Sequence, residues 1–169
     1  NKPLFEEACE LTALGCNVDL TAFPADSSDE DSGDEDSGDQ GWSAEDAVER
    51  YFDKGCDPAK LTISSDGGGC LPHFNEQGEL LKMGFASCSA MADCIKSLLD
   101  RGLSEQAVLP LMTSNVAQLL KLVNKGRIMT GFDADLVVLD QGNRVDSVMA
   151  RGVWQVKNNK QLVSGLFES

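Results

Sequence analysis

A strand, a helix and a second strand follow one another between residues 18 and 65, and this order limits the possible folds. Val18–Phe23 and Lys60–Ser65 are short runs typical of strands. Between them, Ser43 followed by Asp46 resembles a capping box that opens a helix, and Gly55 is placed to end it. The apolar face of this helix would consist of Ala47, Val48, Tyr51 and Phe52. The pattern predicts a βαβ unit with parallel strands and a right-handed crossover.

Two parallel strands cannot form a stable sheet alone, because both edges and both faces would stay open. Helical patterns flank the pair, one over residues 3–14 and another over residues 84–101. Further along, Ser104 and Thr113 are placed to cap two more helices, and Pro110 between them disfavours one continuous helix. The sequence therefore predicts an α/β portion that needs more strands than these two.

The C-terminal third changes to a strand pattern. Ala134–Leu139, Val145–Ala150 and Val153–Val156 are rich in β-branched residues. Lys157–Lys160 is typical of a hairpin turn that leads into Gln161–Val163. These runs predict a small β domain attached to the α/β portion.

More than half of the chain's excess of acidic residues comes from one tract. Of 28 acidic residues, eight lie between Asp26 and Asp39, where the chain has no lysine or arginine. A segment so charged and so poor in apolar residues cannot offset the entropy of ordering, so we expect a disordered acidic insertion over residues 24–41. The net charge of −14 argues against nucleic acid as a partner, and no run is long and apolar enough for a membrane helix.

The six cysteines show no spacing typical of a metal site or of a dense disulfide framework. Cys9, Cys88 and Cys94 fall on helix-like stretches, where a small buried thiol is common. Because no signal-type segment opens the chain, we expect reduced thiols and a cytoplasmic location.

The run Ser64–Gly69 contains the main candidate for chemistry. A strand that ends in Ser-Ser-Asp and continues into three glycines places the carboxylate of Asp66 at a strand end, which is where catalytic groups collect in α/β barrels. The glycines would let the backbone pass close to whatever Asp66 contacts. An aspartate in a tight turn, bonded to its own backbone, explains the local pattern equally well.

The same residues resemble the eighth-strand motif of the isoaspartyl dipeptidases, the β-aspartyl peptidases of the metal-dependent amidohydrolase superfamily. The likeness starts from Ser64–Gly69 with Pro72 and Phe74. It extends to residues 3–6, 18–21, 111–120, 126–128, 131–138 and 150–152. The run Gly-x-Asp-Ala-Asp-Leu within 131–136 indicates only the superfamily, whereas the Ser-Ser-Asp-Gly run is more specific.

The resemblance implies an α/β fold, namely the C-terminal part of a (β/α)8 TIM-type barrel plus a small β-sandwich domain. Residues 1–124 would belong to the barrel and residues 125–169 to the small domain. The family's reaction is the hydrolysis of β-aspartyl dipeptides with two zinc ions. Large homo-oligomers are common in it.

The resemblance also implies roles for four residues. Asp66 matches a metal ligand that moves a proton from the attacking hydroxide to the leaving amine. Gly67, Gly69 and Cys70 lie where the family binds substrate, although a serine is usual at the position of Cys70. A thiol is the weaker hydrogen-bond donor of the two.

The other metal ligands that the family requires are not matched here. The chain has a single histidine, His73, which fits none of them and which we interpret as a loop histidine. One carboxylate cannot hold two zinc ions, so we expect this chain to be the C-terminal half of an enzyme and to be inactive alone. Two alternatives remain: another amidohydrolase, such as a dihydroorotase-like cyclic amidase, or a non-catalytic protein on this fold whose acidic tract binds a partner.

Overall fold

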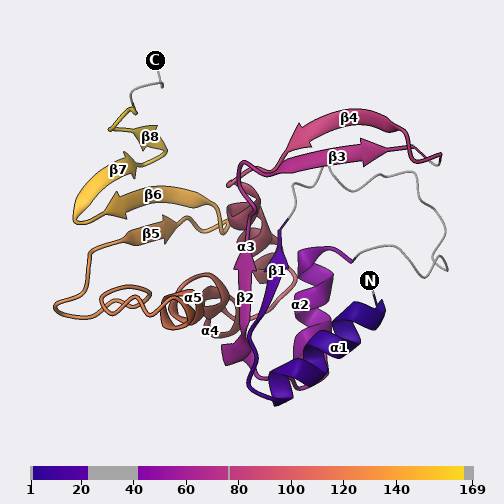
Figure 1. The fold of residues 1–169 in the computed structure, drawn as a ribbon. Coiled ribbons are helices and arrows are strands. Elements are labelled where there is room, and N and C mark those ends of the chain that lie inside the picture. Colours follow the sequence, from indigo (N-terminus) through magenta and orange to yellow (C-terminus); the bar gives the residue numbers. More distant parts are fainter. Residues whose placement is uncertain (1, 23–41, 76, 166–169) are drawn as a thin grey trace. The chain divides into compact units, whose positions relative to one another are not determined.

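A computed structural model describes residues 2–22, 42–75 and 77–165 (Figure 1). The acidic insertion expected over residues 24–41 lies outside the described residues. The chain divides into two compact units, Asn1–Cys94 and Ile95–Ser169. The division between the units falls within the helix Ala90–Asp100. The domain boundary expected between residues 124 and 125 remains a prediction.

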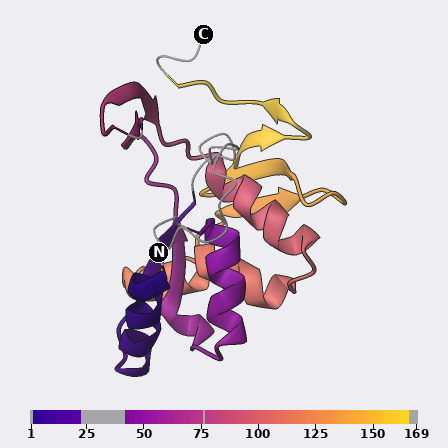
Figure 2. The same ribbon diagram turned by 90° about the vertical axis from the view of Figure 1, so that its right-hand side faces the viewer.

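The first unit is built on a parallel pair of strands. β1 (Val18–Thr21) and β2 (Leu61–Ser64) pair in parallel, with Val18 opposite Leu61 and Thr21 opposite Ser64. The connection contains α2 (Ala44–Asp53), and the pair with its helix is visible from two sides in Figures 1 and 2. The predicted βαβ unit with parallel strands is therefore confirmed.

Helix α2 begins and ends as the sequence predicts. The Ser43 side chain accepts a hydrogen bond from the Asp46 amide at 3.1 Å, which satisfies one amide of the first turn. Gly55 follows the helix with a φ of +71°, a value that favours glycine. The 3-10 turn η2 (Pro58–Lys60) then leads directly into β2.

The core of the first unit contains side chains from α2 and from β2. The buried side chains of α2 are Ala44, Ala47, Val48 and Tyr51. Leu61, Thr62 and Ile63 of β2 are all buried, as expected for a strand of a parallel sheet that is covered on both faces. The Tyr51 hydroxyl donates a hydrogen bond to the Asp57 carbonyl at 2.8 Å, so its polar end is satisfied.

Helix α1 (Lys2–Ala13) forms where the sequence predicts a helix, but it buries fewer apolar residues than expected. Cys9 and Thr12 are its buried residues, while Leu4, Leu11 and Leu14 are exposed. Because a helix buries only the side that meets a neighbour, the described chain covers α1 on one side and leaves these leucines open.

A hairpin follows β2 where the sequence analysis expects a loop and then a helix. β3 (Cys70–Phe74) and β4 (Leu80–Phe85) pair antiparallel, and α3 (Ala90–Asp100) begins six residues later than the helix predicted from Gly84. The Asn75 side chain closes the turn by accepting hydrogen bonds from the amides of Gln77 and Glu79. This pairing keeps Gly84 and Phe85 in a strand.

The second unit contains short helices and an antiparallel sheet. α4 (Glu105–Val108), the 3-10 helix η3 (Leu109–Met112) and α5 (Ser114–Leu119) follow one another, and Pro110 near the start of η3 separates the two helices as predicted. Ser104 and Thr113 occupy the cap positions, but neither side chain caps its helix, and the Thr113 hydroxyl donates to the Leu109 carbonyl instead.

The sheet is a four-stranded meander. The strands β5 (Leu136–Leu139), β6 (Val145–Ala150), β7 (Val153–Lys157) and β8 (Lys160–Gln161) pair in sequence order. Asn158 and Asn159, both with positive φ, make the predicted turn between β7 and β8. None of the helices within the described ranges has the length and apolar character needed to cross a bilayer.

Replacing Ser43 with alanine tests the predicted helix start. The Ser43→Ala change removes the acceptor for the Asp46 amide, and we expect it to lower the free energy of unfolding by about 1 kcal/mol. Ser43→Asp keeps a side-chain acceptor and is the matched control. The urea unfolding midpoint of the full-length protein, followed by circular dichroism, measures both effects. Equal midpoints for the two variants would contradict the capping role.

Candidate functional site

Asp66 stands in a tight turn directly after β2. Its φ is +47°, a left-handed conformation that only a small share of non-glycine residues adopt and in which aspartate is over-represented. The Gly69 amide donates to the Asp66 carbonyl at 2.8 Å, and the Gly67 amide donates to the Ser65 hydroxyl at 3.1 Å. The Asp66 side chain is exposed. Within the described residues its carboxylate accepts no hydrogen bond, so the carboxylate does not close its own turn.

The glycines of the turn are required by contacts that leave no room for a side chain. A Cβ atom on Gly69 would lie 2.6 Å from Asp66 Oδ2 and 2.8 Å from the Asp66 carbonyl oxygen. A Cβ atom on Gly67 would overlap the Cys88 Sγ atom. The backbone therefore passes close to the Asp66 carboxylate itself and to Cys88.

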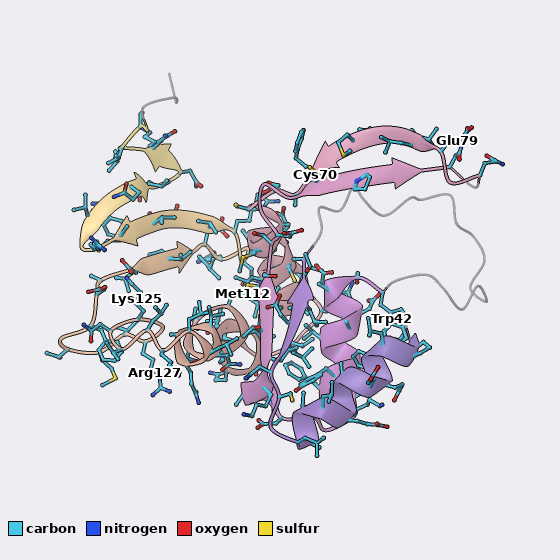
Figure 3. All side chains as sticks on the ribbon, viewed as in Figure 1. Trp42, Cys70, Glu79, Met112, Lys125 and Arg127 are labelled. Atoms are coloured by element: carbon cyan, nitrogen blue, oxygen red, sulfur yellow. The ribbon has the colours of Figure 1, made fainter. Side chains whose placement is uncertain are left out.

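Two backbone hydrogen bonds hold this turn against the end of the hairpin. The Gly68 amide donates to the Ala86 carbonyl and the Ala86 amide donates to the Gly69 carbonyl, both at 2.9 Å. Cys70 begins β3 opposite Phe85, and its side chain is exposed (Figure 3). The structure thus brings Asp66, Gly67, Gly69 and Cys70 together in one short segment, as their spacing requires, and adds Cys88 from a distant part of the sequence.

Asp19 is a further polar group near the end of β2 that the sequence analysis does not single out. Its carboxylate accepts hydrogen bonds from the Thr62 hydroxyl at 2.7 Å and from the Ser64 hydroxyl at 2.5 Å. Asp19 lies on β1 opposite Thr62, so the contact depends on the parallel register. No local motif would have indicated it.

The residues described do not form a metal site by themselves. Across the described ranges no group of three or more histidine, cysteine, aspartate or glutamate side chains is placed to hold an ion. His73, interpreted from the sequence as a loop histidine, lies in β3 opposite Lys82, which corrects that expectation. Asp66 alone does not fit a two-metal centre, because each ion needs several protein ligands.

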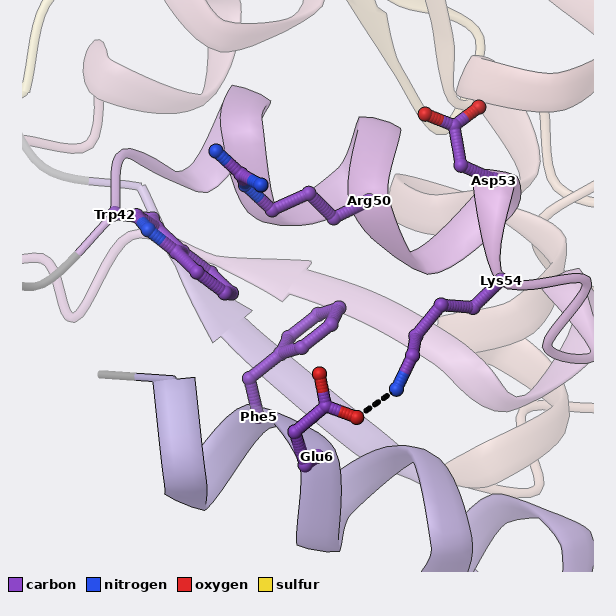
Figure 4. Close-up of a pocket in the computed structure, with 6 residues that line it drawn as sticks. All are labelled: Phe5, Glu6, Trp42, Arg50, Asp53 and Lys54. Atoms are coloured by element: carbon purple, nitrogen blue, oxygen red, sulfur yellow. Dashed lines mark hydrogen bonds and ion pairs between the residues drawn. The ribbon is translucent and has the colours of Figure 1, made fainter.

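A cavity of about 330 Å³ lies between α1 and α2 in the first unit (Figure 4). The Phe5 and Trp42 rings meet edge to face at 5.1 Å, and the Arg50 guanidinium lies 4.3 Å from the Trp42 ring centre. Lys54 forms an ion pair with Glu6, which raises the pKa of the lysine. These contacts connect the two helices. The cavity lining contains two carboxylates, those of Glu6 and Asp53, and two cations, those of Arg50 and Lys54.

All six cysteines are free thiols. Burial, together with a hydrogen bond to Cys56, raises the pKa of Cys9 to about 11. Cys9 is therefore protonated at neutral pH and is a weak nucleophile.

The contact between Gly67 and Cys88 makes a testable prediction. In the full-length protein, Gly67→Ala should lower the melting temperature, because the new methyl group collides with the Cys88 sulfur atom. Adding Cys88→Ala should restore most of the loss, since the Cys88 Cβ atom would then lie 3.6 Å away, an ordinary contact. Thermal unfolding of the single and double variants measures this coupling.

Gly69→Ala is the comparison for this pair. Its methyl group would meet the backbone carbonyl of Asp66, so Cys88→Ala should not rescue it. Additive losses for Gly67→Ala and Cys88→Ala would show that the two residues are not in contact.

Comparison with known proteins identifies the family. A model described as "Amidohydrolase family" matches residues 42–155. The chain is also 30% identical over 97 residues to the N-acetylglucosamine-6-phosphate deacetylase of Lysinibacillus sphaericus, and this match spans 56% of the chain and 25% of the deacetylase.

Among solved structures, the β-aspartyl dipeptidase of Fervidobacterium islandicum in complex with β-Asp-Leu matches 98% of this chain with a TM-score of 0.81 and 30% identity. A second structure of that dipeptidase matches with a TM-score of 0.76 and 28% identity. The chain spans 40% and 38% of these two structures. The resemblance to β-aspartyl dipeptidases stated from the sequence is confirmed, and the chain belongs to the amidohydrolase family.

Proposed function

We propose that the chain is the C-terminal part of a metal-dependent amidohydrolase that cleaves β-aspartyl dipeptides. The observation that carries the proposal is the exposed, unpartnered carboxylate of Asp66 at the carboxyl end of a parallel strand. Such strand ends are where α/β barrels collect their catalytic groups. A structural match that covers 98% of the chain, to an enzyme solved with β-Asp-Leu, supports this substrate class.

The proposal assigns residues 1–124 to the barrel of such an enzyme. β1 and β2 would be neighbouring strands of a (β/α)8 barrel, with α2 in its outer layer of helices. Residues 125–169, with the sheet β5–β8, would belong to the small β-sandwich domain expected from the sequence. The cytoplasmic location and the homo-oligomeric assembly remain predictions.

Asp66 would act on protons during hydrolysis. Its carboxylate accepts a proton from the attacking water as the oxygen adds to the carbonyl carbon of the β-aspartyl amide. The same proton then passes to the amine nitrogen as the carbon–nitrogen bond breaks, which releases aspartate and the second amino acid. The two zinc ions expected from the family would take Asp66 as one ligand and their other ligands from outside this chain.

Gly67, Gly69 and Cys70 would lie against the bound dipeptide. Gly67 and Gly69 have no side chains to obstruct a ligand beside Asp66, and the thiol of Cys70 is exposed next to them. A thiol is a weak hydrogen-bond donor, so Cys70 would contribute less to affinity than a hydroxyl group at this position.

The test of the proposed role is the Asp66→Asn variant of the full-length enzyme. An amide cannot accept the proton from water, so kcat for β-Asp-Leu should fall by about a hundredfold or more while the fold is retained. Asp53→Asn, which alters an exposed carboxylate at the end of α2, is the matched control and should leave kcat unchanged. Bound metal is quantified in both variants. Asp66→Asn activity within tenfold of the wild type would show that the assignment is wrong.

Deacetylation of an N-acetylated amino sugar is a second candidate activity. It is favoured by the match of 97 residues to a deacetylase, and both reactions hydrolyse an amide bond. Parallel assays of the full-length enzyme with β-Asp-Leu and N-acetylglucosamine-6-phosphate distinguish the two. Turnover of the dipeptide alone supports the proposal, and turnover of the sugar alone replaces it.

The 169-residue chain by itself should not hydrolyse β-Asp-Leu. The described residues contain no cluster of three metal-binding side chains, so zinc should bind weakly and without a ratio of two ions per chain. Isothermal titration with zinc and a hydrolysis assay on the metal-loaded chain check both statements. Two tight sites per chain, or turnover above a metal-only blank, would show that residues other than Asp66 form a complete centre here.

A further inference from the structure

We propose that a basic cavity within residues 114–132 binds a small organic anion, a ligand that carries a carboxylate or phosphate group on an apolar body. The cavity has a volume of about 330 Å³, near the lower end of the range for small-molecule sites. Its lining consists of Ser114, Ala117, Gln118, Lys121, Leu122, Val123, Lys125, Arg127 and Phe132. All of these residues belong to the second unit, and the inference does not depend on the proposed hydrolysis.

The backbone at the end of α5 shapes one wall of the cavity. Lys121 adopts a left-handed conformation with a φ of +56°, and the Leu122 amide donates to the Ala117 carbonyl at 2.8 Å. This hydrogen bond ends the helix and turns the chain back beside it. Lys121 and Leu122 are therefore held next to the helix that supplies Ser114 and Gln118.

The opposite wall is held by a glycine and by a closed loop. A Cβ atom on Gly126 would lie 2.7 Å from the Ala117 Cβ atom, so the chain at Gly126 passes directly over α5. The Asp133 amide donates to the Asn124 carbonyl at 3.0 Å, which closes the loop and brings Phe132 back toward α5. Figure 3 labels Lys125 and Arg127 on this loop. These contacts fix the backbone beside the cavity, which is open to solvent because Gln118, Lys121, Leu122, Val123 and Arg127 are exposed.

The charged side chains of the lining are all positive. Lys121, Lys125 and Arg127 line the cavity and no carboxylate does. Lys125 forms ion pairs with Asp133, at 2.8 Å, and with Asp135, and these hydrogen bonds raise the pKa of the lysine. Lys121 and Arg127 have no carboxylate partner in the part of the chain that the structure describes. Two unmatched cations therefore face a cavity that also offers the Ser114 hydroxyl and the Gln118 amide as hydrogen-bond donors.

The remaining lining is apolar and selects the body of the ligand. Ala117, Leu122, Val123 and Phe132 supply the apolar surface. Burying an apolar group against them is favourable, whereas a bare inorganic ion would leave this surface exposed to water. An organic acid or an organic phosphate fits both parts of the cavity.

The distribution of charge along the sequence agrees with an anion site in this unit. Residues 95–169 contain nine lysines and arginines against seven acidic residues, although the whole chain has 14 against 28. The cavity between α1 and α2 lacks such an excess of positive charge, because its lining has as many carboxylates as cations. The chain's overall negative field therefore does not argue against anion binding in the second unit.

Isothermal titration of the full-length protein tests the proposal with benzoate and phenyl phosphate as probes. Benzyl alcohol presents the apolar body without the charge, and inorganic phosphate presents the charge without the body. We expect at least one of the two organic anions to bind more tightly than either control, with an affinity that falls as salt is raised. The tighter of benzoate and phenyl phosphate shows which head group the site prefers.

Substitutions of the lining residues test whether the probe binds in this cavity. Lys121→Ala and Arg127→Ala should each raise the Kd of the preferred probe by about tenfold or more, since each removes a charged hydrogen-bond donor. Arg127→Lys keeps the charge and should retain most of the affinity. Lys160→Ala removes an exposed cation from β8 and is the matched control, with no effect expected.

Three results would overturn the proposal. One is the absence of binding by both organic anions, and another is equal binding of benzyl alcohol. The third is an unchanged Kd in Lys121→Ala and Arg127→Ala. Thermal unfolding of each variant separates loss of the site from loss of the fold, and Arg127→Lys remains informative if an alanine variant does not fold.

Discussion

Asp19 ties β1 to β2 through the hydroxyl groups of Thr62 and Ser64, and the position of the candidate site depends on this contact. The two hydroxyls lie two residues apart, on one side of β2, while Leu61 and Ile63 point to the other side. A slip of one residue would exchange the two sides, which would place Leu61 and Ile63 against Asp19 and carry both hydroxyls away from it. Both errors are costly, so β2 ends at Ser64 and the turn with Asp66 follows at a fixed place.

The three glycines after Asp66 serve three different purposes in the turn. Gly67 makes room for the Cys88 sulfur atom, and Gly69 makes room for the Asp66 carboxylate. Gly68 has a φ of +87°, which a residue with a side chain rarely adopts. The backbone at Gly69 therefore passes close to the Asp66 carboxylate, which stays exposed.

Local sequence signals predicted much of the fold. Ser43 caps α2, Pro110 separates two helices, and Asn158 with Asn159 turns one strand into the next, because each of these effects acts over a few residues. The hairpin of β3 and β4 was missed because Gly84 and Phe85 gain their strand partners from the other side of the turn at Asn75. Pairing between strands is decided by tertiary contacts, which override a short helical pattern.

The residues of the candidate site likewise include some that the local sequence indicates and some that only tertiary contacts bring there. Asp66 could be selected from the sequence because strand, aspartate and glycines are consecutive. Asp19 and Cys88 could not, since the Asp19 contact spans 43 residues and the Cys88 contact depends on how the hairpin returns to the turn. The roles of Asp66, Gly67, Gly69 and Cys70 remain proposals.

The open surfaces of the first unit and the incomplete ligand set have a common explanation in the proposed barrel. Among the described residues, β1 and β2 pair only with each other, so each has an edge at which a further strand could add. Leu4 and Leu11 of α1 and Leu14 just after it are exposed, as expected for a helix whose neighbour is not among these elements. In a closed barrel the added strands would pair with the open edges and bring their own strand ends to the same face as Asp66. The contacts that complete the core would then also complete the ligand set, so folding and metal binding would be coupled in the proposed enzyme.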